Sequence, residues 1–324
     1  MKRFFKIAVR LTLVLFIAFI GFHFWASAAV YPDKEYSKII NLEVNTPSSN
    51  DSIFTIVTYN IGYLSGMTNN LPVAKPQSLF DGNLEKVKSV FKPIPIDILA
   101  FQEIDFTSVR SYDVDQQLEI AKTGYPHIAQ AVNWDKRYLP FPEWPISMHF
   151  GRIYSGQSVM SKFPIISQER IVLGRVASAS FLRDAFYLER LAQVVKLKIK
   201  NKTIVIINVH LEAFDQPTRT KQSEYLVELY NSYKDDYPTL LVGDFNSDPQ
   251  FKGASILKIL NIPNIGNAAF ANKYAYTFDT DRPYKRLDYI FYNKNFIEEV
   301  SSRVITEMGQ ASDHLPVMMT FKLK

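Results

Sequence analysis

The feature that most constrains the fold of this chain is a series of short, β-branched apolar runs that each give way abruptly to polar residues. In the stretch LLVGDFNSDP, residues 240–249, an apolar run is followed at once by acids and an amide. Runs of four to eight such residues predict buried strands. We expect strands at residues 53–61, 97–104, 157–161, 193–199, 203–211, 239–245, 287–292 and 316–323.

Helical periodicity appears in two segments, residues 82–92 and 218–235. A third helix is expected to begin at Pro249, because proline suits a first helical turn. The runs 193–199 and 203–211 flank a short polar link and predict an antiparallel hairpin. Strands outnumber helices and alternate with them, so the sequence predicts one mixed α/β domain with more than one sheet.

The first thirty residues differ in kind from the rest. Residues 1–10 carry four basic side chains and no acid, and residues 11–30 carry no charge. A cleaved signal peptide would use residues 11–24 as its apolar region and the ASA of residues 26–28 as its cleavage signal. An uncleaved transmembrane anchor would use the whole uncharged stretch, which has about the length that a bilayer core requires. In both cases the basic flank stays inside, and the remainder is expected to be membrane-anchored or secreted on the extracytoplasmic side.

The remainder of the chain divides into a polar stretch, residues 31–52, which reads as a linker, and a folded body, residues 53–324. The formal net charge is +5, of which residues 1–10 carry +4, so everything after them carries only +1. A dedicated nucleic-acid partner is therefore not favoured by charge. Cysteine is absent, which excludes disulfides, thiolate metal sites and cysteine nucleophiles.

Acids, amides and histidines recur where the predicted strands end or begin. Taken singly, each could be a turn residue, an exposed strand end or a satisfied core histidine. The run after residue 243 imitates the opening of a helix-loop-helix calcium site, but Pro249 stands where that site needs glycine. Taken together, these residue types favour hydrolysis aided by a hard cation such as Mg²⁺, with Mn²⁺ as the alternative. The residues are Asn60, Glu103, His210, Asp244, Asn246, Asp288, Asp313 and His314.

The motifs TYNIG, FQEID, NVHLE, GDFNSDP, KRLDYIF and SDHLPV follow one another in this order over most of the predicted body. The ordered set resembles the endonuclease/exonuclease/phosphatase superfamily, which includes pancreatic-type deoxyribonucleases, abasic-site endonucleases, neutral sphingomyelinases and inositol-polyphosphate 5-phosphatases. The chain looks like a membrane-targeted member of bacterial type. The resemblance implies a four-layered α/β/β/α sandwich of two mixed sheets with outer helices, following the N-terminal leader or anchor, and a divalent metal at one edge.

The resemblance also implies roles for individual residues. Glu103 matches the main metal ligand of the family, Asn60 matches its amide neighbour, and Asp313 lies near the metal. Asp244 and Asn246 match the pair that orients the attacking water and the phosphate. The implied reaction is in-line attack of water on a phosphate ester, without a covalent intermediate.

The histidines take the remaining implied roles. Asp288 matches the acid that orients the imidazole of His314, which is the expected general base; Asp244 is the competing base. His210 would stabilise the phosphorane or assist the leaving group. Arg190 resembles a phosphate-contacting arginine of the deoxyribonucleases, although a lone charge at a strand start is also often just solvated.

The substrate is the least constrained part of the prediction. Asp105 stands where deoxyribonucleases have an arginine, which together with the nearly neutral body counts against a dedicated nuclease. Residues 133–157 hold both tryptophans of the body and are either a loop whose aromatics pack on the sandwich or an apolar rim that contacts lipid. The sequence thus predicts an extracytoplasmic phosphodiesterase or phosphatase for membrane lipid headgroups. The alternatives are an exported nuclease or nucleotide phosphatase, or an inactive binding module.

Overall fold

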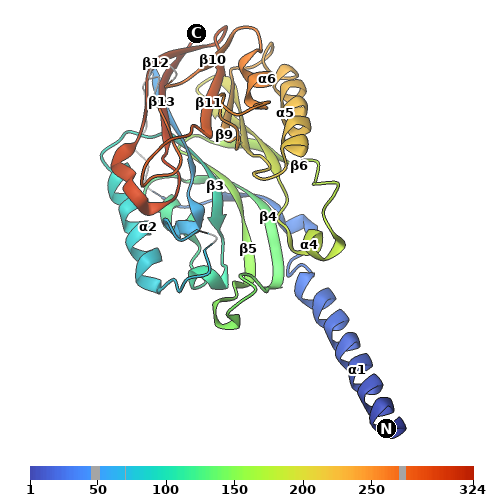
Figure 1. The fold of residues 1–324 in the computed structure, drawn as a ribbon. Helices are drawn as coiled ribbons and strands as arrows, with labels where there is room; N and C mark the ends of the chain where they lie inside the picture. Colours follow the sequence, from blue (N-terminus) through green and yellow to red (C-terminus); the bar gives the residue numbers. More distant parts are fainter. Residues whose placement is uncertain (45–51, 70, 270–274) are drawn as a thin grey trace.

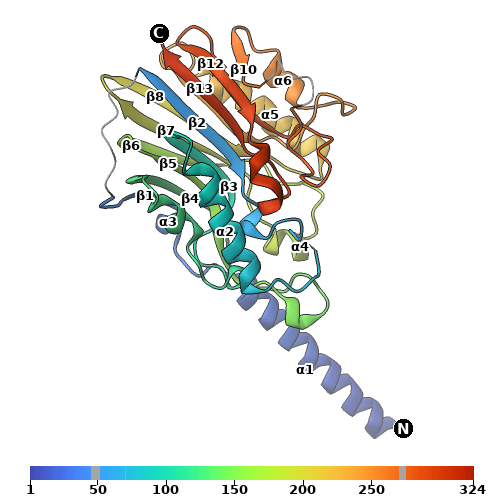
Figure 2. The same cartoon turned by 90° about the vertical axis from the view of Figure 1, so that its left-hand side faces the viewer.

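Two stacked β-sheets with helices on their outer faces form the body of the protein, and a long N-terminal helix projects from one end (Figures 1 and 2). The computed structural model describes residues 1–44, 52–69, 71–269 and 275–324. The predicted fold class, a four-layered sandwich of two mixed sheets, is confirmed.

The first sheet has seven strands in the order β1-β4-β5-β3-β2-β13-β12. Only β2 and β3 run parallel; all other neighbours are antiparallel. The strands are β1 (Ser37–Asn41), β2 (Ile53–Asn60), β3 (Ile98–Asp105), β4 (His127–Leu139), β5 (Gly151–Ser161), β12 (Ile297–Val304) and β13 (Val317–Leu323).

The second sheet has six strands in the order β10-β11-β9-β8-β7-β6. It also contains a single parallel pair, β8 and β9. The strands are β6 (Ile165–Val172), β7 (Leu191–Ile199), β8 (Lys202–His210), β9 (Thr239–Asp244), β10 (Ile265–Asn267) and β11 (Asp288–Asn293). The expected hairpin is confirmed as β7 and β8.

Helices lie on the outer faces of both sheets, whereas the N-terminal helix projects from one end of the body. Among the described residues they are α1 (Lys2–Ser27), α2 (Gln77–Phe91), α3 (Gln116–Ala121), α4 (Phe181–Phe186), α5 (Gln216–Asn231) and α6 (Ile256–Leu260), with short 3₁₀ turns between strands. Helices α2 and α3 pack on the seven-stranded sheet, and α5 and α6 on the six-stranded sheet.

Alternation along the strands produces these layers, since successive side chains point to opposite faces. On β2, Ile56 lies in the apolar core between the sheets, and Val57 lies in the core under α2. On β9, Leu240 lies between the sheets, and Leu241 lies under α5 and α6. Strands that are buried on both faces read as continuous apolar runs, which is why the sequence marked them clearly.

Three local expectations need correction. Pro249 does not begin a helix: residues 249–253 form turns, and α6 begins at Ile256. Residues 133–157 are mostly strand, in β4 and β5, with a loop only at residues 140–150. Within the predicted linker, residues 37–41 form the edge strand β1 of the seven-stranded sheet, so this part does not hang free. Residues 45–51 of that linker lie outside the described part of the chain.

Candidate active site

The two parallel strand pairs deliver the central polar residues to one edge of the sandwich. Asn60 ends β2, and Glu103 lies near the end of the adjacent β3. His210 ends β8, and Asp244 ends the adjacent β9. The two pairs face each other, since the Asn60 side-chain amide donates to Asp244 Oδ2 at 3.0 Å. This hydrogen bond therefore joins the carboxyl end of β2 in one sheet to the carboxyl end of β9 in the other.

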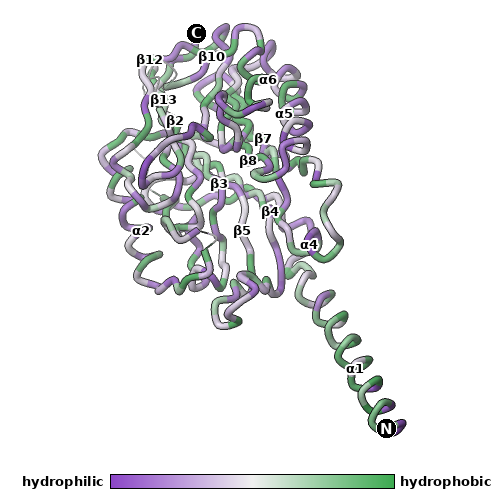
Figure 3. Tube along the Cα trace, in the orientation of Figure 1, coloured by the Kyte–Doolittle hydropathy of each residue, from purple (hydrophilic) through white to green (hydrophobic). Residues whose placement is uncertain are grey.

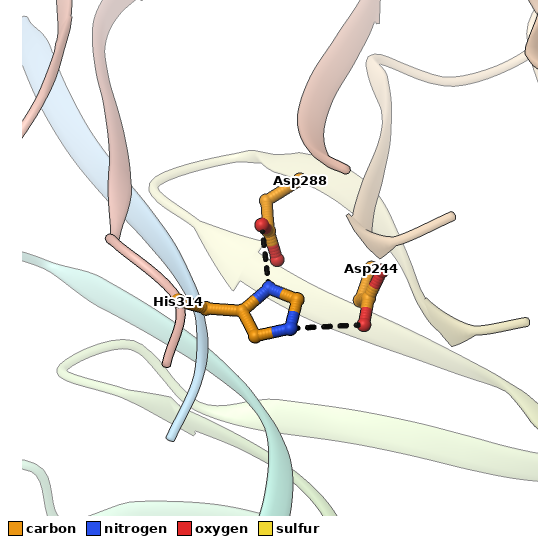
Figure 4. Close-up of side chains that lie close together, drawn as sticks. All are labelled: Asp244, Asp288 and His314. Carbon is orange, nitrogen blue, oxygen red and sulfur yellow. Dashed lines mark hydrogen bonds and ion pairs between the residues drawn. The ribbon is translucent and has the colours of Figure 1, made fainter. Parts of the chain in front are cut away.

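A buried group of Asp244, Asp288 and His314, drawn from both sheets, forms one half of the site (Figure 4). Asp288 begins β11 and lies opposite Asp244 in the antiparallel register. His314 precedes β13 of the other sheet; its Nδ1 lies 2.9 Å from Asp288 Oδ2, and its Nε2 lies 3.9 Å from Asp244 Oδ2. The predicted orientation of His314 by Asp288 is thus present in the geometry.

The charges of this group are strongly coupled. Burial raises the pKa of Asp244 to about 7; the positive charge of His314 opposes the rise and Asp288 adds to it. Burial alone would lower the pKa of His314, but the two facing carboxylates, Asp288 and then Asp244, raise it well above its ordinary value. At neutral pH, without a cation bound, the imidazolium of His314 therefore carries a proton, and Asp244 lies close to its titration point.

The backbone around Asp244 explains why the motif has its sequence. An added Cβ at Gly243 would lie 2.0 Å from the Val209 carbonyl oxygen, so only glycine lets β9 approach β8 this closely. Asn246 adopts φ +48°, a left-handed conformation that asparagine tolerates better than most residues. Its amide nitrogen donates to Asp244 Oδ1 at 2.8 Å, and its side chain donates to the Leu211 carbonyl at 3.0 Å. Asn246 therefore holds the Asp244 carboxylate in one orientation.

Glu103 occupies the other half of the site. It lies at a break in the register between β3 and β5, with φ +51°, and its Oε2 accepts from the Asn69 side chain at 2.9 Å. Strained non-glycine residues of this kind concentrate at functional sites. The pKa of Glu103 is raised by burial and by the negative charge of Asp313. The negative charge of Asp313 beside Glu103 is one that a divalent cation can neutralise.

The donor set fits a hard cation at either of two neighbouring places. Glu103, Asn60 and Asp313 are the set predicted from the sequence. The ligand atoms of Asp244, Asp288 and His314 lie within 4.8 Å of one another. In this second set, however, one ligand is an imidazole, and His314 Nδ1 and Asp288 Oδ2 already bond each other. Glu103 Oε2 accepts from the Asn69 side chain, and Glu103 Oε1 lies 3.7 Å from His210 Nε2. The Glu103 side is thus the better match to the oxygen ligands that Mg²⁺ prefers.

His210 has different neighbours from His314. Arg190 Nη1 lies 2.6 Å from His210 Nε2, and the guanidinium also contacts Glu212 and the Tyr187 hydroxyl. Burial and the Arg190 charge lower the pKa of His210 well below its ordinary value, so the ring is neutral. Arg190 is buried, and its structural role is to hold His210; the predicted phosphate contact stays a proposal.

An amide network that the sequence did not reveal fixes the distance between the sheets behind the site. Gln102 on β3 donates to the Asn208 side chain on β8 at 2.6 Å, and Asn208 donates to the Phe101 carbonyl at 3.1 Å. Gln102 directly precedes Glu103 in β3, and Asn208 lies two positions before His210 in β8. Hydrogen bonds between buried amides of facing strands favour a single arrangement of the groups that they join.

Asp105 requires a correction. We expected it to present a negative charge to a substrate, but its carboxylate is fully buried and forms an ion pair with Arg110 at 2.9 Å. The Arg110 guanidinium in turn lies 3.4 Å from the ring centroid of Tyr63. The acid at this position is neutralised internally, so it does not argue against a nucleic-acid substrate.

A separate cavity of about 560 Å³ lies between the end of β6 and the start of α5, lined in part by Ile171, Arg175 and Lys221. None of the predicted site residues lines it. The chemistry-bearing residues are instead those at the strand ends.

Similar proteins are found in three comparisons. A curated relative, a UPF0294 protein of Vibrio campbellii, is 27% identical over 194 residues, which are 56% of this chain and 64% of the relative; the chain therefore spans less than two thirds of that protein. Among solved structures, an endonuclease/exonuclease/phosphatase from Beutenbergia cavernae is 18% identical with a TM-score of 0.64, covering 84% of this chain and 72% of that one.

Two further structures share the fold. The human Nocturnin catalytic domain, solved with a bound sulfate anion, has a TM-score of 0.59 at 18% identity over 91% of this chain and all of that domain. A mannosyl-6-phosphatase from Bacteroides thetaiotaomicron has a TM-score of 0.56 at 16% identity over 84% of this chain and 99% of that one. At these identities the likeness concerns the fold alone. The profile of the Endonuclease/Exonuclease/phosphatase family, however, matches residues 57–314, and the chain belongs to that family.

Proposed function

We propose that this protein is a divalent-metal-dependent hydrolase of phosphate esters that acts outside the cytoplasmic membrane on phospholipid headgroups. Members of the family are generally phosphoric ester hydrolases and typically need a divalent metal. The observation that carries the proposal for this chain is the meeting of Glu103, Asp244 and His314 at one edge of the sandwich, with coupled charges.

Metal binding is assigned to Glu103, Asn60 and Asp313. The negative charge of Asp313, which raises the pKa of Glu103, supports this assignment, and Mg²⁺ is the proposed ion, with Mn²⁺ as substitute. When bound, the ion would neutralise negative charge that develops on the phosphate.

The proton transfer is assigned to the group of Asp244, Asp288 and His314. Asp244, with a pKa of about 7, accepts a proton from the attacking water, whose oxygen bonds to phosphorus as the ester oxygen leaves. Protonated His314, held by Asp288, stabilises the charge of the phosphoryl oxygens. This order makes Asp244 the base and reverses the preference drawn from sequence alone, because a histidine between two carboxylates keeps its proton.

Asn246 and Arg190 complete the proposed substrate contacts. Asn246 holds Asp244 and presents its side chain at the site edge. Arg190 acts through the neutral ring of His210, which it contacts directly, and places positive charge near the phosphate. His210 is then a positioning group for the phosphorane rather than an acid or base.

Lipid is favoured as substrate because the described chain holds one helix that is long and apolar enough to cross a membrane, and this helix joins the body directly. An exported nuclease or nucleotide phosphatase is the second candidate, supported by the internal neutralisation of Asp105.

A substrate panel tests the proposal. The full-length protein in detergent would be assayed with bis-p-nitrophenyl phosphate, sphingomyelin, phosphatidylinositol species and supercoiled DNA, with Mg²⁺ and with chelator, beside His314→Ala. We expect metal-dependent turnover of a lipid that the variant loses. Nicking of DNA without lipid turnover would select the second candidate, and absence of turnover on the whole panel would argue against hydrolysis of these esters.

A further inference from the structure

The C-terminal end of helix α1 is seated on the body of the protein. Along most of its length α1 is exposed, but His23 and Ala26 are buried. The ring of His23 lies 5.3 Å from those of Phe181 and Phe186, the first and last residues of α4. On the other side of α1, the ring of Trp25 stacks on that of Tyr138 of β4 at 6.4 Å, and the two helices and the strand lie together in Figure 1.

The chain that leaves α1 is also fixed to the body. The backbone amide of Arg137 donates to the Ala28 carbonyl at 2.9 Å. The Asp135 carboxylate accepts from the amides of Val30 and Tyr31 at 2.9 and 2.8 Å. No free spacer therefore separates the apolar helix from β4. A membrane that contains α1 must lie directly against this end of the body.

Four exposed apolar side chains belong to α4 and the β4–β5 loop, at the end of the body where α1 is seated. We call them the apolar collar: Phe181 and Leu182 of α4, exposed by 66% and 50%, and Trp144 and Ile146 of the β4–β5 loop, exposed by 75% and 62%. Figures 1 and 2 both place this loop and α4 at the end from which α1 projects, and Figure 3 shows the hydrophobic length of α1 itself. Exposed aromatic and aliphatic side chains beside a membrane helix fit the boundary between headgroups and acyl chains.

The strand directions put the active site at the same end. Strands β2 and β3 run parallel and end at the site, and β4 runs in their direction because both β3 and β4 are antiparallel to β5. Asp105 of β3 and Trp134 of β4 both lie opposite Ser155 of β5. From this level β4 continues to Leu139, so its loop projects past the catalytic edge. The apolar collar and the active site therefore lie toward the same end of the body.

We propose that α1 is an uncleaved membrane anchor that is part of the folded structure, and that the apolar collar dips into the surface of the bilayer that α1 spans, holding the active site toward the lipid headgroups. The evidence for the apolar collar as a membrane-docking surface is the packing of α1 and the exposure of the four side chains. This surface deepens the lipid assignment but does not depend on catalysis.

The retention of α1 follows from its contacts. Cleavage after the ASA of residues 26–28 would remove the rings that pack on Tyr138 and Phe186. It would also cut beside the Ala28 carbonyl, which is bonded to β4. A cleaved leader would have no need of either contact.

The mass of the protein recovered from membranes tests the anchor. We expect the full 37.3 kDa chain. A mature protein that begins near residue 29 would overturn the proposal.

Lipid-borne quenchers test the collar. The full-length protein would be placed in vesicles of phosphatidylcholine and phosphatidylglycerol, with bromine atoms on the acyl chains close to the headgroups. The difference between the emission of wild type and Trp144→Phe isolates Trp144 from the other two tryptophans. We expect the bromolipid to quench this difference emission by at least about half and aqueous iodide to leave it largely unchanged. Quenching by iodide with no effect of bromolipid would overturn the proposal.

Variants separate the collar from a general loss of stability. Leu182→Ser removes one apolar side chain of the collar and so weakens its insertion into the bilayer surface. Bromolipid quenching of Trp144 should therefore fall by about half. The matched control is Leu257→Ser on α6, at the opposite end of the body; Leu257 is exposed by 43%, against 50% for Leu182. Equal quenching in both variants would count against the collar. Since none of these readouts uses turnover, an inactive protein can still bear out the docking surface.

Discussion

His210, at the end of β8, and His314, just before β13, face the same oxygen of Asp244, at 3.6 and 3.9 Å, yet their protonation differs. His314 lies between Asp288 and Asp244, and its pKa is raised. His210 is buried beside Arg190, and its pKa is lowered. The partner of each imidazole, rather than the residue type, therefore decides its protonation: His314 carries a positive charge, and His210 is a neutral ring held in place.

Removing the charged histidine should have the largest effect. In His314→Ala, the buried carboxylates of Asp288 and Asp244 lose their counter-charge, and we expect turnover to fall on the order of 10³-fold. His210→Ala should cost about tenfold to 100-fold, because that ring is neutral. Steady-state hydrolysis of bis-p-nitrophenyl phosphate measures both.

His127 serves as the control histidine, since it lies at the far end of β4 and bonds Asn41. His127→Ala should keep turnover within about twofold. Equal losses of turnover in His314→Ala and His210→Ala would contradict the different roles of the two histidines.

Removing the cation beside His210 should act mainly on folding. Arg190→Met leaves Glu212 buried without its ion pair, and the free energy of unfolding should fall by about 3 to 5 kcal/mol. Chemical denaturation followed by circular dichroism measures the change. Arg303→Met, which breaks an exposed pair with Glu307, should cost less than about 1 kcal/mol. A similar loss of unfolding free energy in the two variants would show that the Arg190–Glu212 ion pair does not stabilise the structure around His210.

Removing the charge that supports His314 should have a smaller effect on rate. Asp288→Asn keeps the shape of the side chain, lowers the pKa of His314 and should reduce turnover by about 100-fold. The alkaline limb of the rate profile should move to lower pH, because His314 then loses its proton more easily. Asp281→Asn, at an exposed acid, is the control and should leave the profile unchanged. An unmoved alkaline limb in Asp288→Asn would remove His314 as the group that must be protonated.

The acid limb should report Asp244. Its carboxylate must ionise to accept a proton, so kcat/KM should rise with pH through a pKa of about 7 or below. A divalent cation nearby favours the ionised form, and raising Mg²⁺ should therefore move this limb to lower pH by about one unit. Initial rates across pH at low and high Mg²⁺ test this. An acid limb that does not move with Mg²⁺ concentration would show that Asp244 does not sense the metal.

The sequence predicted the interior of the fold better than its borders. All eight predicted strands are present. Of the five that were missed, β1, β12, β6 and β10 are the four sheet edges, and β4 is next to one. A strand at an edge is partly exposed and carries mixed polar and apolar residues, so it leaves no continuous apolar run to detect.

The site followed the same rule. Residues that end buried strands, such as Asn60 and Asp244, were visible because polarity changes abruptly there. Asn69 and Glu212, which hold Glu103 and Arg190, were not visible, because each is an ordinary loop residue until the fold brings it to its partner. Pro249 misled because proline suits turns as well as helix starts.

The most direct test of the central claim is the Mg²⁺ dependence of bis-p-nitrophenyl phosphate hydrolysis by the full-length protein, for wild type, Glu103→Gln and His314→Ala. The account predicts saturable activation by Mg²⁺ that a chelator abolishes. Glu103→Gln should need at least about tenfold more Mg²⁺ for half-activation, whereas His314→Ala should keep the wild-type midpoint at a much lower maximal rate. Turnover that survives the chelator, or a midpoint unchanged by Glu103→Gln, would contradict it.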